Sequence, residues 1–231
     1  MRIPVFLIAS PIGDYLQDLS VSAIHTLKSV THVFVEANDK YLERLRERGI
    51  LSDQHRVYLL SDPQVDRARG FIRAQEPFAI LASSGIPCFL DPGSELVALC
   101  LDHHLDDVEL IPVGVSSALD AGLCMCGLDV DIFHFNGHYP EHHIFESSLP
   151  DNGIPLVYFV RGATVSAFVA EVRAKVPNVR RLVLLKDLRK KRRSLVTVVR
   201  WPEDDDGQLP PDPADADFVC VIDRSRDEPG R

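Results

Sequence analysis

The chain has 231 residues, 45% of them apolar and 26% charged, a composition typical of globular proteins with a buried core. It contains no apolar run of the roughly 18 residues that a membrane-spanning helix needs, and the apolar start is broken by Pro11 and Gly13, which favours a first strand over a signal peptide. A formal net charge of −9 argues against a broad nucleic-acid-binding surface, so neither a membrane nor DNA is expected as a partner. The five cysteines lack the spacing of a disulfide framework and predict reduced thiols in a cytoplasmic protein.

Strands and helices alternate in the first half of the chain. Ser20 is expected to cap the first helix, Asp62-Pro63 to start a helix that ends near Gln75, and Ser94 to cap the helix that follows the fourth strand. Such an alternation with short connections predicts an α/β domain with a mostly parallel sheet and helices on both faces. Apolar runs predict the strands at residues 4–9, 32–35, 57–60, 78–82 and 108–113.

The pattern changes after Gly114. A small-residue helix is followed by several strands with only one further helix among them, at residues 164–175, which predicts a mixed, partly antiparallel sheet. We therefore expect an N-terminal α/β domain at residues 1–114 and a C-terminal mixed α/β domain at 115–231. The strands of this second domain are expected at residues 133–136, 155–160, 181–185, 194–201 and 218–222, and the acidic, proline-rich stretch 202–217 is expected to be a solvated loop.

Three loops rich in small and hydroxyl residues follow predicted parallel strands, at residues 10–14, 83–87 and 114–117. Open α/β sheets bind ligands at the carboxyl ends of their strands, so three such loops at one edge predict a cleft there. None of them has the glycine pattern of a dinucleotide or triphosphate site. Taken singly, each loop is also compatible with a plain strand-to-helix connection that binds nothing.

Several sequence blocks resemble the tetrapyrrole (corrin/porphyrin) methylase superfamily, and in particular short members of the ribosomal RNA small subunit methyltransferase I branch. They are SPIGDYLQDLS, ILASSGIPCFLDPGSELV, IPVGVSSALDAGLCMCGL and FHFNGHYP, and their order and spacing match from about residue 5 to residue 222. The resemblance implies a two-domain tetrapyrrole methylase-like fold, S-adenosylmethionine as cofactor in a cleft between the domains, and a homodimer. For the closest branch it also implies 2′-O-methylation of ribosomal RNA.

Site residues follow from the resemblance position by position. Pro11 and Gly13 match the loop that faces the acceptor. The matched cofactor positions are Ser83, Ser84, Gly85, Asp91, Ser116, Ser117, Phe159 and Leu185. The sequence differs from the branch in two segments, and both differences concern activity and substrate more than fold. Residues 82–87 lack the acidic residue that is usual in this loop, and the segment Glu36-Ala37-Asn38-Asp39 lacks the usual arginine.

The resemblance implies no obligatory nucleophile. Asp14, Glu36 and His138 are candidate bases or orienting groups, although a cap, a surface charge and a satisfied histidine are the more ordinary roles for them. His138 and its neighbouring histidines favour an exposed loop over a metal site, so no metal is expected, and Cys124 and Cys126 favour core packing.

One dense basic run, residues 186–193, offers Arg189, Lys190 and Arg192 to the phosphates of RNA. A solvated turn between two strands accounts for the same run equally well.

Three functions remain open on the sequence alone. The first is an S-adenosylmethionine-dependent methyltransferase acting on ribosomal RNA. The second is methylation of a tetrapyrrole or another small molecule, which the acidic net charge and the missing arginine favour. The third is a catalytically silent protein that binds the cofactor or RNA, which the altered loop at residues 82–87 favours.

Overall fold

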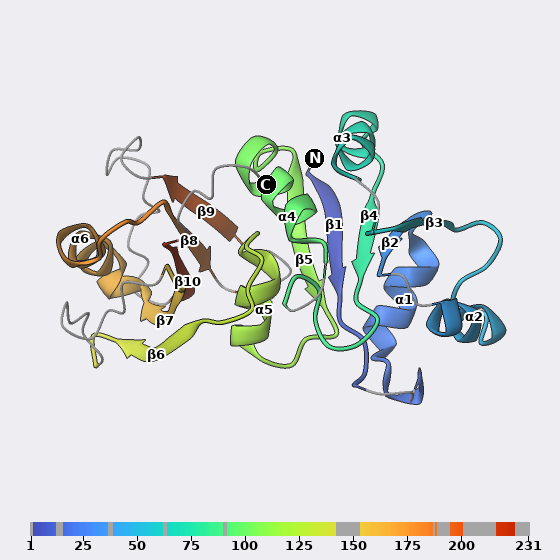
Figure 1. The fold of residues 1–231 in the computed structure, drawn as a ribbon, viewed down its shortest axis with the longest axis horizontal. Coiled ribbons are helices and arrows are strands. Elements are labelled where there is room, and N and C mark those ends of the chain that lie inside the picture. Colours follow the sequence, from blue (N-terminus) through green and yellow to red (C-terminus); the bar gives the residue numbers. More distant parts are fainter. Residues whose placement is uncertain are drawn as a thin grey trace. The chain divides into compact units, whose positions relative to one another are not determined.

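The structure, a computed structural model, divides into two compact units, Met1–Asp129 and Val130–Arg231 (Figure 1). The division falls later than the predicted one at residue 114, because the helix after Gly114 lies in the first unit. A Cβ atom on Gly127 would lie 3.0 Å from the backbone of Ala98, so the end of that helix packs closely on the preceding one. The structure describes residues 2–12, 16–36, 39–61, 64–89, 92–141, 153–186, 188, 195–200 and 216–224.

The first unit is built on a five-stranded sheet in the order β3-β2-β4-β1-β5, in which every neighbouring pair of strands is parallel. All residues of β2 and β4 are buried, as expected for strands covered on both faces. The predicted parallel sheet is confirmed. Its strands are β1 (Ile3–Ile8), β2 (His32–Val35), β3 (Arg56–Leu59), β4 (Phe78–Leu81) and β5 (Val108–Val113).

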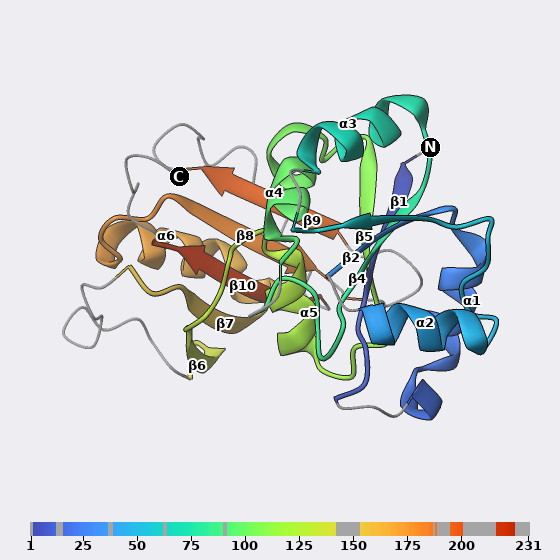
Figure 2. The ribbon, with the colours of Figure 1, turned by 45° about the vertical axis from the view of Figure 1, so that its right-hand side comes forward.

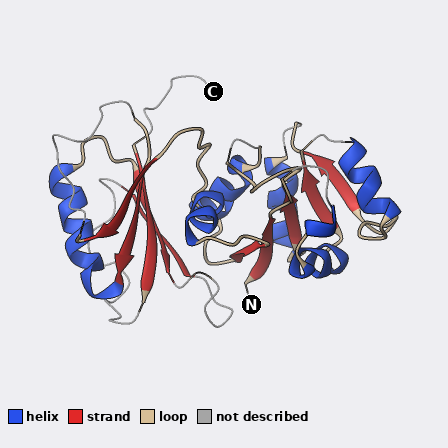
Figure 3. Ribbon diagram, turned by 90° about the horizontal axis from the view of Figure 1, so that it is seen from below, coloured by secondary structure: helices blue, strands red, loops and turns tan. Residues whose placement is uncertain are grey.

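Helices cover both faces of this sheet, as predicted (Figure 3). On one face, Leu27 and Leu45 from the first two helices join a buried cluster with Val33 of β2. On the other face, the ring of Phe71 lies 6.0 Å from Phe34 and 6.3 Å from Phe78, measured between centroids. The helices are α1 (Val21–Ser29), α2 (Asp39–Glu47), α3 (Val65–Ala74), α4 (Ser94–His103) and α5 (Ala118–Met125), and a short 3₁₀ helix (Leu16–Asp18) precedes α1.

One of the three predicted helix starts is confirmed and two are displaced. Ser20 caps α1 by accepting a hydrogen bond from the backbone N–H of Ala23 at 3.1 Å. The helix α3 begins only at Val65, whereas Asp62-Pro63 lies outside the described residues.

At α4 the cap is Gly93, and Ser94 is the first helical residue. Gly93 has φ +116°, and a Cβ atom there would lie 3.1 Å from Ile80, so the close approach to β4 requires glycine at the turn.

The second unit contains a five-stranded sheet in the order β6-β7-β10-β8-β9 (Figure 2). Only β6 and β7 are parallel, so the predicted mixed sheet is confirmed. β6 extends to Tyr139, beyond its predicted end, with a register shift between Phe135 and His138. The elements are β6 (His134–Tyr139), β7 (Leu156–Arg161), α6 (Val165–Lys175), β8 (Arg181–Lys186), β9 (Leu195–Arg200) and β10 (Asp217–Asp223), with a short 3₁₀ helix (Gly162–Thr164) before α6.

The cysteines are all free and buried, which supports their interpretation as reduced core thiols. Burial raises the pKa of the Cys100 thiol to about 12, so very little of it is thiolate at neutral pH.

Within the described part of the chain, no helix is long and apolar enough to cross a membrane.

A buried ion pair links two strands of the second unit. Arg181 of β8 lies opposite Asp223 of β10, and its Nε donates to Oδ2 of Asp223 at 3.2 Å. Only 8% of Arg181 and 1% of Asp223 is exposed. Removing one partner of such a pair leaves a charge buried, which typically costs about 3–5 kcal/mol, whereas replacing both by apolar residues is often close to neutral.

We therefore expect Arg181→Met to lower the free energy of unfolding, measured in urea, by about 3–5 kcal/mol. The double variant Arg181→Met/Asp223→Leu should recover most of that loss, because no buried carboxylate is left behind. A double variant no more stable than the single one would show that the pair does not act through its buried charge.

Candidate functional site

The loops that follow β1, β4 and β5 meet at the carboxyl edge of the parallel sheet. Ser10 and Gly85 form an antiparallel bridge: Ser10 N donates to Gly85 O at 2.8 Å, and Gly85 N donates to Ser10 O at 3.1 Å. Ala9 N donates to Val113 O at 2.9 Å, which ties the first loop to the end of β5. The predicted convergence of three loops is thus confirmed within the first unit.

Gly114 brings the third loop close to the first. Its φ of +79° is one that residues with a side chain rarely adopt. A Cβ atom at this position would lie 3.2 Å from Oγ of Ser20 and 3.4 Å from the carbonyl oxygen of Ala9. Glycine here therefore lets the start of the third loop lie against both the first loop and the cap of α1.

A buried pair of hydroxyl groups fixes the first two loops. Oγ of Ser10 donates to the carbonyl oxygen of Ala82 at 2.6 Å and lies 2.6 Å from the hydroxyl oxygen of Tyr41. Since the one proton of Ser10 goes to Ala82, the Tyr41 hydroxyl donates to Ser10. Both side chains are buried, and burial raises the pKa of Tyr41, an effect that the hydrogen bond with Ser10 partly opposes.

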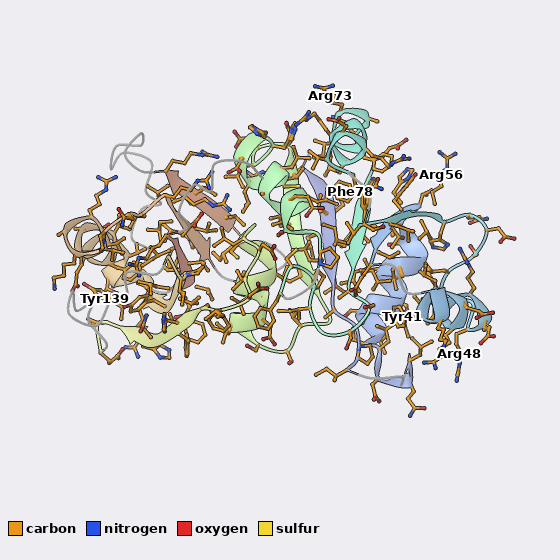
Figure 4. The ribbon with its side chains drawn as sticks, in the orientation of Figure 1. Tyr41, Arg48, Arg56, Arg73, Phe78 and Tyr139 are labelled. Atoms are coloured by element: carbon orange, nitrogen blue, oxygen red, sulfur yellow. The ribbon has the colours of Figure 1, made fainter. Side chains whose placement is uncertain are left out.

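Tyr41 was not among the predicted site residues. The sequence placed it only on the inward face of α2, and Figure 4 shows it between α2 and the neighbouring strands. The signal that could have found it was its residue type, because a buried tyrosine hydroxyl usually needs a hydrogen-bond partner.

A carboxylate stands directly beside the second loop. Glu36 follows the end of β2, and its Oε2 accepts a hydrogen bond from the hydroxyl of Ser83. The sequence singled out both residues but did not pair them. The acidic group absent from residues 82–87 therefore has a counterpart next to the loop, contributed by the neighbouring strand.

The remaining predicted residues of the first unit differ in their exposure. Ser84 and Ser116 are exposed, and Pro11 is half-buried. Ser117 is exposed as well and caps α5, because its Oγ accepts from the N–H groups of Leu119 and Asp120 at 3.1 and 3.3 Å. Gly13, Asp14 and Asp91 lie outside the described residues.

The predicted residues of the second unit form no comparable cluster. The half-buried ring of Phe159 lies 5.0 Å from that of Phe135 and 5.3 Å from that of His138, which makes an aromatic face on β6 and β7. Leu185 is buried in β8, paired with Val219 and Val196. Two of the candidate bases, His138 and Glu36, belong to different units. The predicted cleft between the domains stays a prediction. Arg189, Lys190 and Arg192 lie outside the described residues.

The carboxyl edge of the first unit suits a ligand that carries hydroxyl and carboxylate groups. Gly85 has φ +75°, and a Cβ atom there would meet nothing within 4 Å, so there is space beside this residue, whose N–H and C=O both take part in the bridge with Ser10. The Ser84 hydroxyl can donate, whereas the proton of Ser83 already goes to Glu36, and the Glu36 carboxylate can also accept from ligand hydroxyls. These donors and acceptors fit the ribose and the methionine carboxylate of S-adenosylmethionine. Among the described residues, no three His, Cys, Asp or Glu side chains are grouped so that they could hold a metal ion.

Comparisons with known structures found uroporphyrin-III C-methyltransferase from Thermus thermophilus, at 18% identity and a TM-score of 0.37, covering 97% of this chain and 93% of that one. The methyltransferase CobJ matches at 14% identity and a TM-score of 0.38, covering 96% and 94%. TM-scores at this level are too low to support a conclusion about this chain. No protein-family model matches it.

Two curated sequence relatives share one name. The "Ribosomal RNA small subunit methyltransferase I" of Synechocystis sp. is 29% identical over 170 residues, which are 67% of this chain and 56% of the relative. The protein of that name from Neisseria meningitidis serogroup B is 25% identical over 191 residues, 80% of this chain and 64% of the relative. The chain thus spans less than two thirds of the length of either relative. These relatives confirm the resemblance to the ribosomal RNA small subunit methyltransferase I proteins that the sequence blocks predicted.

Proposed function

We propose that the chain is an S-adenosylmethionine-dependent methyltransferase that acts on ribosomal RNA of the small subunit, as a homodimer in the cytoplasm. The observation that carries the proposal is the junction of three loops at one sheet edge, fastened by the bridge between Ser10 and Gly85. Sequence relatives named as ribosomal RNA methyltransferases support the choice of reaction and acceptor.

The residues of this edge would hold the cofactor. Ser83, Ser84 and Gly85 belong to one loop, with open space beside Gly85, and Ser116 adds a hydroxyl from the third loop. Glu36 would accept hydrogen bonds from ribose hydroxyls, a task for which carboxylates are well suited. When bound, the cofactor supplies a methyl group activated by its sulfonium, for transfer to an acceptor oxygen.

The chain itself must align the acceptor, exclude water and take a proton. Alignment alone supplies up to about 7–11 kcal/mol in the best intramolecular cases, so a rigid loop junction matters more here than a strong base. A base adds about 10²- to 10⁴-fold when a hydroxyl is the acceptor. Of the two candidate bases within the described residues, Glu36 lies at the carboxyl edge and its Oε2 accepts a hydrogen bond from Ser83, which supports it as the base.

Aromatic side chains in the second unit support a planar ligand. Phe135 is 44% exposed and, with Phe159 and His138, presents ring surfaces on which adenine or an RNA base can stack.

The net charge of −9 favours the second candidate function, methylation of a small molecule. The two differ in acceptor and share the cofactor site.

Calorimetric titration with S-adenosylmethionine tests the cofactor site, with micromolar binding expected. Glu36→Gln should weaken that binding by about tenfold, because a charged hydrogen-bond acceptor is removed while the hydrogen bond with Ser83 is kept. Glu76→Gln, a matched change at the opposite sheet edge where Glu76 pairs with His32, should leave the affinity unchanged. A protein that fails to bind millimolar cofactor would overturn the proposal.

The hydroxyl pair at the loop junction predicts a selective effect of Tyr41→Phe. Removing one hydrogen bond of this kind costs about 0.5–1.5 kcal/mol, so Tyr41→Phe should lower the unfolding free energy and also weaken cofactor binding. Tyr58→Phe, which removes a hydroxyl lying 3.1 Å from Nδ1 of His32, should lower stability similarly without affecting binding. Equal binding by both variants would contradict a role for Tyr41 in positioning the loops.

Transfer of labelled methyl groups to small ribosomal subunits lacking the modification tests the acceptor. Charge reversal at Arg189, Lys190 and Arg192 should weaken RNA binding and reduce its salt dependence, by a slope of about 0.7 for each phosphate of a single strand that the variant no longer neutralises. The same reversal at Lys28, Arg46 and Arg48 serves as the matched control. Cofactor binding without transfer to RNA would favour the small-molecule function or a silent protein.

A further inference from the structure

The hydroxyl group of Ser83 is used inside the protein, which is not the role that the resemblance implies for it. The resemblance places Ser83 among the residues that contact the cofactor. In the structure the single proton of this hydroxyl goes to Oε2 of Glu36, so it cannot also donate to a ligand. Ser84, the next residue, is exposed, and its hydroxyl can face a ligand instead. The two serines of this loop therefore have different tasks.

The backbone on both sides of Ser83 is held by hydrogen bonds. The N–H of Ala82 donates to the carbonyl oxygen of Ile8 at 3.2 Å, and the carbonyl oxygen of Ala82 accepts from Oγ of Ser10. Two residues after Ser83, Gly85 forms its bridge with Ser10. Ser83 thus stands on a segment whose position is fixed by β1 and by the loop that follows β1.

The backbone before Glu36 is held as well, but its side chain is long. Val35 pairs with Leu81 of β4, and its carbonyl oxygen accepts from the N–H of Leu60 at 2.8 Å. Glu36 comes next and is half-buried. Fixing the rotatable bonds of a glutamate costs conformational entropy. The hydrogen bond from Ser83 fixes the carboxylate before a ligand arrives, and preorganisation of this kind raises affinity.

We propose that Ser83 is a positioning residue that holds Oε2 of Glu36 and leaves Oε1 to accept from the ribose hydroxyls of the bound cofactor. The inference rests on the proposed function, because it concerns the same cofactor site. A carboxylate has two oxygens, so one can be held by the protein while the other binds a ligand. Hydrogen bonds to a charged acceptor are the stronger ones, so the position of this carboxylate decides how well ribose is recognised. Ser83 thus selects for a ribose-bearing ligand without donating to it.

The preference for ribose tests this role. Calorimetry measures the affinity of each variant for S-adenosylhomocysteine, the demethylated product, and for its 2′,3′-dideoxyribose analogue. The wild type should bind the ribose form about tenfold more tightly or better. Ser83→Ala should reduce this preference to about threefold or less, because the Glu36 carboxylate is no longer held. Ser83→Thr should keep the preference, because its hydroxyl can still donate.

A matched control is Ser29→Ala, which removes a hydroxyl that donates to the carbonyl oxygen of Thr26 at 2.8 Å in α1 and should leave the preference unchanged. A merely structural effect of Ser83→Ala on the loop would weaken the binding of both ligands alike. The preference for ribose would then be unchanged, and the inference would be overturned.

A double-mutant cycle with Glu36→Ala separates positioning from direct contact. If Ser83 acts through Glu36, Ser83→Ala should change the affinity for S-adenosylhomocysteine by less than about twofold once residue 36 is alanine. Additive effects of the two substitutions would overturn the inference and leave the cofactor site in place. A wild-type protein that binds neither ligand at millimolar concentration would overturn the proposed function, and this inference with it.

Discussion

The hydroxyl group of Ser10 holds together the part of the first unit on which the proposed activity depends. This hydroxyl donates to the carbonyl oxygen of Ala82 and accepts from the hydroxyl of Tyr41. The backbone of Ser10 forms a bridge with that of Gly85. Three segments far apart in the sequence are thus fixed by one small residue. Each of these hydrogen bonds contributes only about 0.5–1.5 kcal/mol, yet leaving one of the buried groups unpaired costs about 1–3 kcal/mol. The relative positions of the loops are therefore fixed mainly because another arrangement would leave a buried polar group without a hydrogen bond.

At the same edge, a carboxylate from a neighbouring strand lies beside a loop that carries no acid. Residues 82–87 carry no acid, but Glu36 at the end of β2 reaches Ser83. In a parallel sheet the carboxyl ends of all strands lie at one edge, so side chains from neighbouring loops come within reach of one another.

The sequence predicted the fold well because strands such as β2 and β4 are covered on both faces and read as continuous apolar runs. It misplaced helix starts where the deciding contact is distant in the chain. Ser94 has the residue type of a cap, but the closeness of Gly93 to Ile80 sets the turn one residue earlier. Likewise, small-residue loops predicted the position of the candidate site. The pairing of Tyr41 with Ser10 joins a helix and a loop that no local pattern relates, so only the tertiary structure reveals it.

The two edges of the parallel sheet differ in the charge that their helix ends favour. At the carboxyl edge the helices begin, so their N–H groups and positive dipole ends favour negative groups, and small residues suffice. At the amino edge the helices end, and their carbonyl groups favour cations. Arg73 and His104 at the ends of α3 and α4 satisfy that preference, which by itself explains why basic residues lie there.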